Sequence, residues 1–251
     1  MLFLLTNDDG IHSRGLRILA DSLREIGKIS VVAPDRERSA AAHSLTLHRP
    51  LRAEQISTGW YSVDGTPTDC INLGVFGLLK RKPDMIISGI NRGGNLGDDI
   101  MYSGTVAAAV EGCLLEIPSF AISLVVNRGQ HYETAASIAE LMVKKIRKHG
   151  LPHRTFLNVN VPDVAEDKLQ GIRITRQGRK QYGETIVERK DPRGGAYYWV
   201  GAGEVHVVPI EGCDIEAVAD AYVSVTPLHL DMTNYPACDI LKGWNLSRAE
   251  R

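Results

Sequence analysis

The chain has 251 residues, of which 43% are hydrophobic and 24% are charged, with a formal net charge of −1. These values are those of an ordinary globular protein, and they exclude a chain that is disordered throughout. A near-neutral chain has no overall field to hold a long nucleic acid, so an anionic ligand must be held by a local site. The sequence has neither a run of eighteen apolar residues nor a secretory signal, so we expect a cytoplasmic protein without a membrane span.

The first elements of the chain are expected to be a strand, a helix and a second strand. Leu2–Thr6 is a short apolar run typical of a buried strand. Arg14–Ile26 has apolar residues at helical spacing, and Gly27 follows it as a stop signal. Ile29–Ala33 is again a buried strand, which Pro34 ends.

Strand and helix signals continue to alternate in the following segment. Thr66 followed by a proline predicts a helix start, and the helix is expected to end near Leu79. The later elements are expected at Met85–Ser88 (strand), Val106–Leu115 (helix), Ser119–Leu124 (strand), Glu133–His149 (helix) and Thr155–Val161 (strand). This alternation predicts an α/β fold, with a Rossmann-like, mostly parallel sheet and helices on both faces.

The last part of the chain has a different pattern. Residues 173–209 hold many β-forming side chains around the turn cluster Asp191–Gly195, which predicts a long hairpin projecting from the core. Tyr222–Thr226 is expected to be a late strand that returns to the core. We therefore expect a catalytic core at residues 1–170 and a β-hairpin and C-terminal oligomerisation region at residues 171–251.

An acidic pair directly follows the first strand. In open α/β sheets, ligands bind beyond the carboxyl ends of the strands, and Asp8 and Asp9 stand at such a point. Two adjacent carboxylates repel each other, and a bound cation would remove that cost. The alternative is a loop with two solvated aspartates, one of which caps the next helix.

The segment after the second strand also begins at this edge of the sheet. Ser39 offers a hydroxyl oxygen, and Arg36 and Arg38 are candidates to face a phosphate. The alternative is a surface loop with ion pairs among its own side chains.

A glycine-rich loop follows the strand at Met85–Ser88. Asn91 and Asn95 in this loop offer amide oxygens, which suit a hard cation. Ser103-Gly104-Thr105 then precedes a helix of small residues, and the free N–H groups and hydroxyls at such a helix start form an anion site. We therefore expect Asn95, Ser103, Gly104 and Thr105 to bind phosphate. The loop is neither a Walker loop nor a dinucleotide fingerprint, and the alternative is a structural loop with a capped helix.

These segments converge because the carboxyl ends of parallel strands meet at one edge of a sheet. Asp8, Asp9, Ser39 and Asn91 would together form a cation site made only of oxygen atoms, which favours Mg²⁺ or Mn²⁺ over zinc. A metal next to a phosphate site, without a Walker loop, indicates hydrolysis of a phosphate monoester. Asp8 and Asp9 are the candidate catalytic residues, as a base or as a phosphoryl acceptor.

Other polar residues near these segments are less specific. Asp98 and Asp99 are either groups behind the site or a solvated acidic turn. His43 is expected to have a surface or packing role. The basic stretch before the hairpin is expected to be a solvated or interface face, with phosphate or base contacts as the alternative, and it comprises Arg173, Arg176, Arg179 and Lys180. The aromatic run at Tyr197–Trp199 is expected at an oligomer interface.

Taken together, these segments resemble the SurE family of survival-protein 5′/3′-nucleotidases. The segments that carry the resemblance are TNDDGI at 6–11, VVAPDRERSA at 31–40, GTPTDC at 65–70, SGINRGGNLGDD at 88–99, YSGTVAAAVEG at 102–112 and VSVTPLHLDMT at 223–233. The resemblance implies a phosphatase acting on nucleoside 5′- and 3′-monophosphates, with short polyphosphate as a further substrate. It also implies one divalent cation per subunit on Asp8, Asp9, Ser39 and Asn91, and a homodimer or homotetramer.

Two other functions are compatible with parts of the pattern. A nucleotide-binding module without turnover would have little reason to place two carboxylates beside an anion site. A haloacid-dehalogenase-type phosphatase requires an Asp-x-Asp after the first strand, whereas Asp8 and Asp9 are adjacent. Both features favour the metal-dependent nucleotidase.

Overall fold

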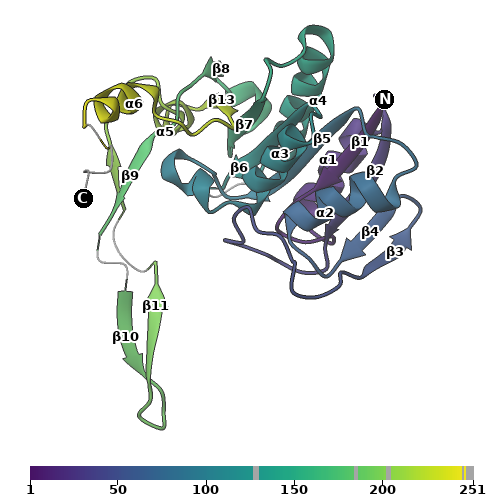
Figure 1. Cartoon of the computed structure of the whole chain (residues 1–251). Coiled ribbons are helices and arrows are strands. Elements are labelled where there is room, and N and C mark those ends of the chain that lie inside the picture. The colour runs from purple at the N-terminus through teal and green to yellow at the C-terminus, as the bar shows by residue number, and fades with distance from the viewer. Residues whose placement is uncertain (127–129, 184–185, 202–204, 245, 247–251) are drawn as a thin grey trace.

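A nine-stranded sheet forms the centre of the chain (Figure 1). The computed structural model describes residues 1–126, 130–183, 186–201, 205–244 and 246. The strand order is β3-β4-β2-β1-β5-β6-β7-β13-β8. The strands span Leu2–Thr6 (β1), Lys28–Pro34 (β2), Ala53–Ser57 (β3), Trp60–Val63 (β4), Met85–Arg92 (β5), Ser119–Val125 (β6), Thr155–Pro162 (β7), Gly171–Ile174 (β8) and Tyr222–His229 (β13). The six strands from β4 to β7 are parallel, which confirms the predicted fold class.

Helices cover both faces of the sheet. The helices of the described residues span Arg14–Leu23 (α1), Pro67–Leu73 (α2), Gly104–Leu114 (α3), Tyr132–His149 (α4), Asp214–Ala219 (α5) and Tyr235–Lys242 (α6), of which α6 has no buried residue. On one face, α1 and α4 enclose the largest core, in which Phe3, Leu16 and Phe120 are fully buried. On the other face, α2 and α3 pack over Leu4 and Ile86. Burial of each such side chain contributes about 1.5–3 kcal/mol, so the sheet is a rigid base for the loops at its edge.

The helix ends agree with the capping signals in the sequence. Thr66 caps α2 as predicted: its hydroxyl accepts a hydrogen bond from the Asp69 backbone N–H at 3.1 Å, and the Asp69 carboxylate accepts one from the Thr66 backbone N–H at 2.8 Å. This capping box satisfies two amide groups that a helix start leaves unpaired. After Leu73 the helix widens into a π-helical turn, Gly74–Leu78, which ends near the predicted position.

The fold differs from the expected elements at several points. α1 ends at Leu23 instead of Ile26, and β13 continues to His229 instead of ending at Thr226. β3 and β4 form an edge hairpin that the sequence pattern does not predict, because all five residues of β3 are exposed and lack an apolar pattern. β5 runs to Arg92 instead of Ser88, so Asn91 lies at the end of a strand. The short helices α5 and α6 are also absent from the expected elements.

The segment predicted as a long hairpin forms an arm that projects from the sheet (Figure 1). Its root is the antiparallel pair β9 (Arg179–Tyr182) and β12 (Val205–Val208). Further out, β10 (Ile186–Lys190) pairs with β11 (Ala196–Val200). β8 and β13 precede and follow the arm, and both belong to the central sheet. No helix in the described part of the chain is long and apolar enough to cross a membrane.

The strand order changes direction beside β1. From β1 the chain continues to β2 on one side, and β5 and β6 follow on the other side. Such a switch point leaves a crevice at the carboxyl ends of β1 and β5, which is where α/β sheets bind ligands. Asp8 and Asn91 lie at these two strand ends.

Candidate functional site

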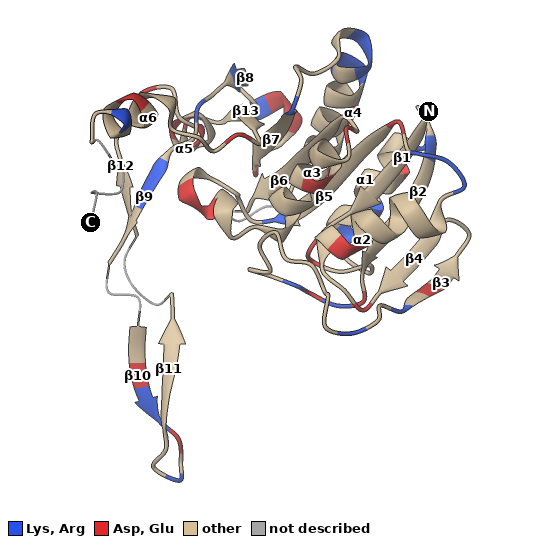
Figure 2. Cartoon of the chain, in the orientation of Figure 1, with Lys and Arg blue, Asp and Glu red and all other residues tan. Residues whose placement is uncertain are grey.

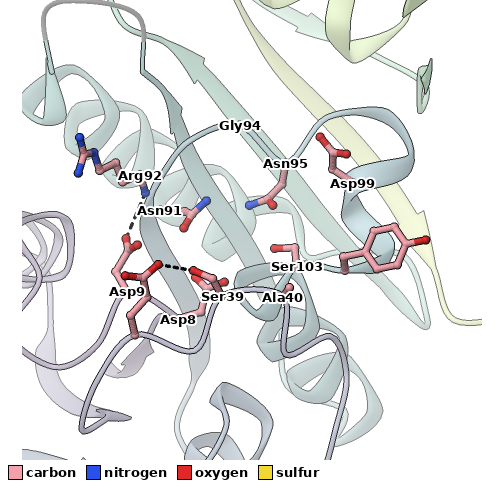
Figure 3. Close-up of a pocket in the computed structure, with 12 residues that line it drawn as sticks. Asp8, Asp9, Ser39, Ala40, Asn91, Arg92, Gly94, Asn95, Asp99 and Ser103 are labelled. Atoms are coloured by element: carbon pink, nitrogen blue, oxygen red, sulfur yellow. Dashed lines mark hydrogen bonds between the residues drawn. The ribbon is translucent and has the colours of Figure 1, made fainter. Parts of the chain in front are cut away.

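An open cavity of about 540 Å³ lies at this switch point (Figure 3). It is bounded by the segments after β1 and β2, the end of β5 with the loop that follows, and the start of α3. The residues that line it are Asp8, Asp9, Glu37, Ser39, Ala40, Asn91, Arg92, Gly94, Asn95, Asp99, Tyr102 and Ser103. Four separate segments that the sequence singled out are thus brought together.

Asp8 lies at the bottom of the site and contacts the start of α3. Its carboxylate accepts a hydrogen bond from the Thr105 hydroxyl. Burial raises the pKa of Asp8, while the Thr105 hydroxyl and the backbone N–H groups of Thr105 and Gly104 oppose that rise. A Cβ atom on Gly104 would lie 2.9 Å from the Asp8 Cβ, so only glycine permits this approach. Gly104 and Thr105 therefore stand behind Asp8, and neither lines the cavity itself.

Asp9 is the more accessible member of the acidic pair. Its Oδ2 accepts a hydrogen bond from the Arg92 backbone N–H at 3.1 Å (Figure 3). Burial, followed by the neighbouring Asp8 charge, raises the pKa of Asp9 to about 6. The pair is therefore destabilised by its own charge and has room on the cavity side for a cation.

The Ser39 loop is attached to the acidic pair through the backbone. The Arg38 N–H donates to the Asp8 carbonyl oxygen at 2.7 Å. The Ser39 hydroxyl donates to the Glu37 carboxylate, which also lines the cavity. Glu37 is not among the predicted site residues, because in the sequence it resembles one of several charged residues in a surface loop.

The two arginines of this loop do not line the cavity. The Arg38 guanidinium contacts Asp35 at 3.3 Å and the Asp64 carbonyl oxygen at 3.1 Å, and the Arg36 guanidinium lies 3.8 Å from Asp35. The contacts with Asp35 are ion pairs within the loop, as expected if this segment is a surface loop whose arginines do not face a phosphate. Arg92 instead lines the cavity, directly after Asn91 in β5.

Asn91 presents its amide oxygen to the site. The amide nitrogen donates to the Gly93 carbonyl oxygen at 2.9 Å, which fixes the side chain. The oxygen is therefore the atom with which Asn91 can bind a cation.

Asn95 is held by buried polar side chains at the ends of β6 and β7. Its amide nitrogen donates to the Ser123 hydroxyl at 2.8 Å, and its backbone N–H donates to Asn160 at 2.9 Å. Its carbonyl oxygen accepts from Asn158 at 2.8 Å and from Asn160 at 3.0 Å. The sequence pattern does not single out these supporting residues, although polar side chains within an otherwise apolar strand are a usable signal.

The four candidate cation ligands provide oxygen atoms of three kinds. Asp8 and Asp9 supply carboxylates, Ser39 a hydroxyl and Asn91 an amide oxygen. Among the described residues, no group of three or more His, Cys, Asp or Glu side chains is arranged to hold a metal. The donor set fits a hard divalent cation, which accepts neutral oxygen ligands, and does not fit zinc.

Comparison with known proteins identifies the family. The family model described as survival protein SurE matches residues 3–184. The chain belongs to the SurE family. It is 54% identical to the 5′-nucleotidase SurE of Geobacter sulfurreducens over 248 residues, which cover 98% of this chain and 95% of the relative. It is 53% identical to the 5′-nucleotidase SurE of Geotalea uraniireducens, over 98% of this chain and 100% of the relative.

A solved SurE structure supports the fold. The crystal structure of the SurE protein from Aquifex aeolicus matches with a TM-score of 0.86 and 44% sequence identity. The match covers 98% of this chain and 100% of the other. The two proteins thus share one architecture over nearly the whole of this chain.

Proposed function

We propose that this chain is a divalent-cation-dependent phosphatase that hydrolyses nucleoside 5′- and 3′-monophosphates to nucleoside and phosphate. The observation that carries the proposal is the acidic pair after β1, which faces the start of α3 in a cavity that also holds the oxygen atoms of Ser39 and Asn91. The names of the relatives, 5′-nucleotidase SurE, support the hydrolysis of nucleoside 5′-monophosphates. Short polyphosphate is a further proposed substrate.

The charges of the cavity explain why a cation is needed. Its lining residues include four carboxylates, from Asp8, Asp9, Glu37 and Asp99, against the single basic side chain of Arg92, so a phosphate dianion would be repelled without a further compensating charge. We propose that Asp8, Asp9, Ser39 and Asn91 hold one Mg²⁺ or Mn²⁺ ion. When bound, this ion would neutralise negative charge on the phosphoryl group.

The start of α3 is the proposed phosphate site. Ser103 lines the cavity at the N-cap of the helix, and its hydroxyl accepts a hydrogen bond from the Val106 backbone N–H at 3.0 Å. Backbone N–H groups at a helix start favour negative charge, so we propose that Ser103 and Asn95, which line the cavity, contact the phosphoryl oxygens. Gly104 and Thr105 would contribute from behind Asp8, through the positive end of the helix. In the reaction a water oxygen, or a carboxylate oxygen in the covalent route, bonds to phosphorus as the bond between phosphorus and the ester oxygen breaks, and the ester oxygen takes up a proton as the nucleoside leaves. In the covalent route, water then releases phosphate from the carboxylate. Asp8 or Asp9 acts as the base for water or as the phosphoryl acceptor.

The proposed assembly is a homodimer or homotetramer located in the cytoplasm. Exposed apolar side chains on the arm, on α6 and just after α6 support self-association, and they include Ile186, Tyr198, Trp199, Val200, Ile240 and Trp244. Cys70, Cys113, Cys213 and Cys238 are free thiols, which fits a reducing compartment.

Phosphate release from a panel of nucleoside monophosphates tests the proposal. We expect release that stops in EDTA, returns with Mg²⁺ or Mn²⁺, and falls by about 100-fold or more in Asp9→Asn. Asp167→Asn is the matched control, because Asp167 is exposed and pairs only with its neighbour Lys168 in the described structure. Metal-independent release, or wild-type turnover in a folded Asp9→Asn protein, would refute the proposal.

A further inference from the structure

One wall of the cavity is a short turn, Gly97–Met101 (η2), together with the tyrosine that follows it. Asp99 and Tyr102 line the cavity from this wall. Tyr102 is 63% exposed and directly precedes Ser103, the N-cap of the proposed phosphate helix. A nucleoside attached to a phosphate at Ser103 would therefore meet the ring of Tyr102 and the carboxylate of Asp99.

The root of the arm holds this wall in place. The Lys180 backbone N–H donates to the Asp98 carboxylate at 2.9 Å. The Lys180 ammonium group and the Tyr182 hydroxyl both donate to the Asp99 carboxylate. Figure 2 shows the acidic turn beside the basic segment of β9. Residues about 80 positions apart in the chain thus fix the carboxylate at the edge of the cavity.

The buried carboxylate of Asp214 links the turn Gly97–Met101 to the root of the arm. Asp214, at the start of α5, accepts hydrogen bonds from the backbone N–H groups of Gly97 at 2.9 Å and Gly178 at 2.8 Å. Asp214 is fully buried, so these bonds are shielded from water. The turn and the strand β9 that begins at Arg179 are therefore held as one unit.

The hydrogen bonds from Lys180 and Tyr182 hold the Asp99 carboxylate in position. The Lys180 and Asp99 side chains are only 17% and 31% exposed, so their ion pair is partly shielded. Burial and the nearby Asp99 raise the pKa of Tyr182 to about 12, so its hydroxyl remains a donor well into the alkaline range. A carboxylate has about four acceptor sites, so Asp99 can also accept a hydrogen bond from a sugar hydroxyl.

We propose that Lys180 and Tyr182 are positioning residues for nucleotide binding. The arm root holds Asp99 and Tyr102 where they contact the nucleoside, with the Tyr102 ring against the base. The phosphate itself is bound at the start of α3, without a contribution from the arm. This inference rests on the proposed function, and it gives the arm a role in the site besides self-association.

The test separates binding of the nucleoside from binding of the phosphate. Lys180→Ala and Tyr182→Phe should each raise KM for a nucleoside monophosphate about 10-fold, with kcat within about 3-fold of wild type. Inhibition by inorganic phosphate, which reaches only the phosphate site, should stay within about 2-fold. The matched controls Lys190→Ala and Tyr197→Phe lie on β10 and β11 of the arm and should behave as wild type.

Three outcomes would overturn the inference. They are an unchanged KM in both variants, a parallel loss of affinity for inorganic phosphate, and a KM change that occurs only when light scattering shows a changed oligomer mass. If the wild type releases no phosphate from any monophosphate, the proposed function fails, and equilibrium dialysis with nucleotide and with inorganic phosphate still tests the inference. Weaker nucleotide binding with unchanged phosphate binding would then support it.

Discussion

Replacement of Asp9 by asparagine should stabilise the metal-free protein while it removes activity. The pKa of Asp9 is raised from 3.8 to about 6, chiefly by burial and next by the Asp8 charge. Two pKa units correspond to about 3 kcal/mol, which we reduce to about 1–2 kcal/mol because Asp9 is partly exposed. Asparagine keeps the shape and can still accept the hydrogen bond from the Arg92 backbone N–H.

The expected effect depends on pH. The folded-state pKa of Asp9 lies above the unfolded value, so its contribution to stability is present below about pH 4 and is lost as pH rises through about 6. The advantage of Asp9→Asn should therefore be complete near pH 8 and roughly half as large at pH 5. In a protein of this size, 1–2 kcal/mol at pH 8 raises Tm by about 2–8 °C.

Thermal unfolding in EDTA, at pH 5 and pH 8, measures this difference. Addition of Mg²⁺ or Mn²⁺ should raise the Tm of the wild type and leave Asp9→Asn nearly unchanged, since a ligand stabilises only the state that binds it. Asp167→Asn again serves as the exposed control. If Asp9→Asn unfolds below the wild type at pH 8 in EDTA, the charge of Asp9 does not destabilise the site and the reasoning is wrong.

Two further substitutions test the surroundings of the site. Thr105→Val removes the hydroxyl that donates to Asp8 and should lower kcat/KM about 10- to 100-fold, measured by phosphate release at saturating metal. A wild-type rate would contradict a role for this bond. Asp214→Ala leaves the backbone N–H groups of Gly97, Gly178 and Ile215 without their acceptor and should cost about 3 kcal/mol in urea unfolding. A loss below about 1 kcal/mol would show that water replaces the carboxylate.

The central fold is predictable because its signals are local. Continuous apolar runs such as Leu2–Thr6 become fully buried strands, and the polar loops after them fall at one edge of a parallel sheet. This rule, applied to the sequence alone, is sufficient to place Asp8, Ser39 and Asn91 at one cavity. The edge strand β3 escapes prediction because its exposed side chains carry no periodic pattern.

The contacts of the site are less predictable because they join distant parts of the chain. The sequence leaves Asp98 and Asp99 ambiguous between a solvated turn and a group behind the site, since their partners Lys180 and Tyr182 lie more than 80 positions away. Asn95 is predicted as a phosphate contact, but the side chains that fix it belong to β6 and β7. Pairings of this kind follow from the packing of the strands, which the sequence pattern does not specify.

The site combines a rigid base with charges that destabilise one another. Asp8 is buried against the start of α3, where backbone N–H groups and the Thr105 hydroxyl stabilise its charge. Asp9 accepts one backbone hydrogen bond, from Arg92, which does not offset burial and the Asp8 charge, so the pair retains an unfavourable energy in the absence of a cation. Because the sheet and α3 cannot relax to separate the two carboxylates, that energy favours cation binding. The same rigidity would keep the phosphate site at Ser103 in a fixed position relative to the ion, which proximity in catalysis requires.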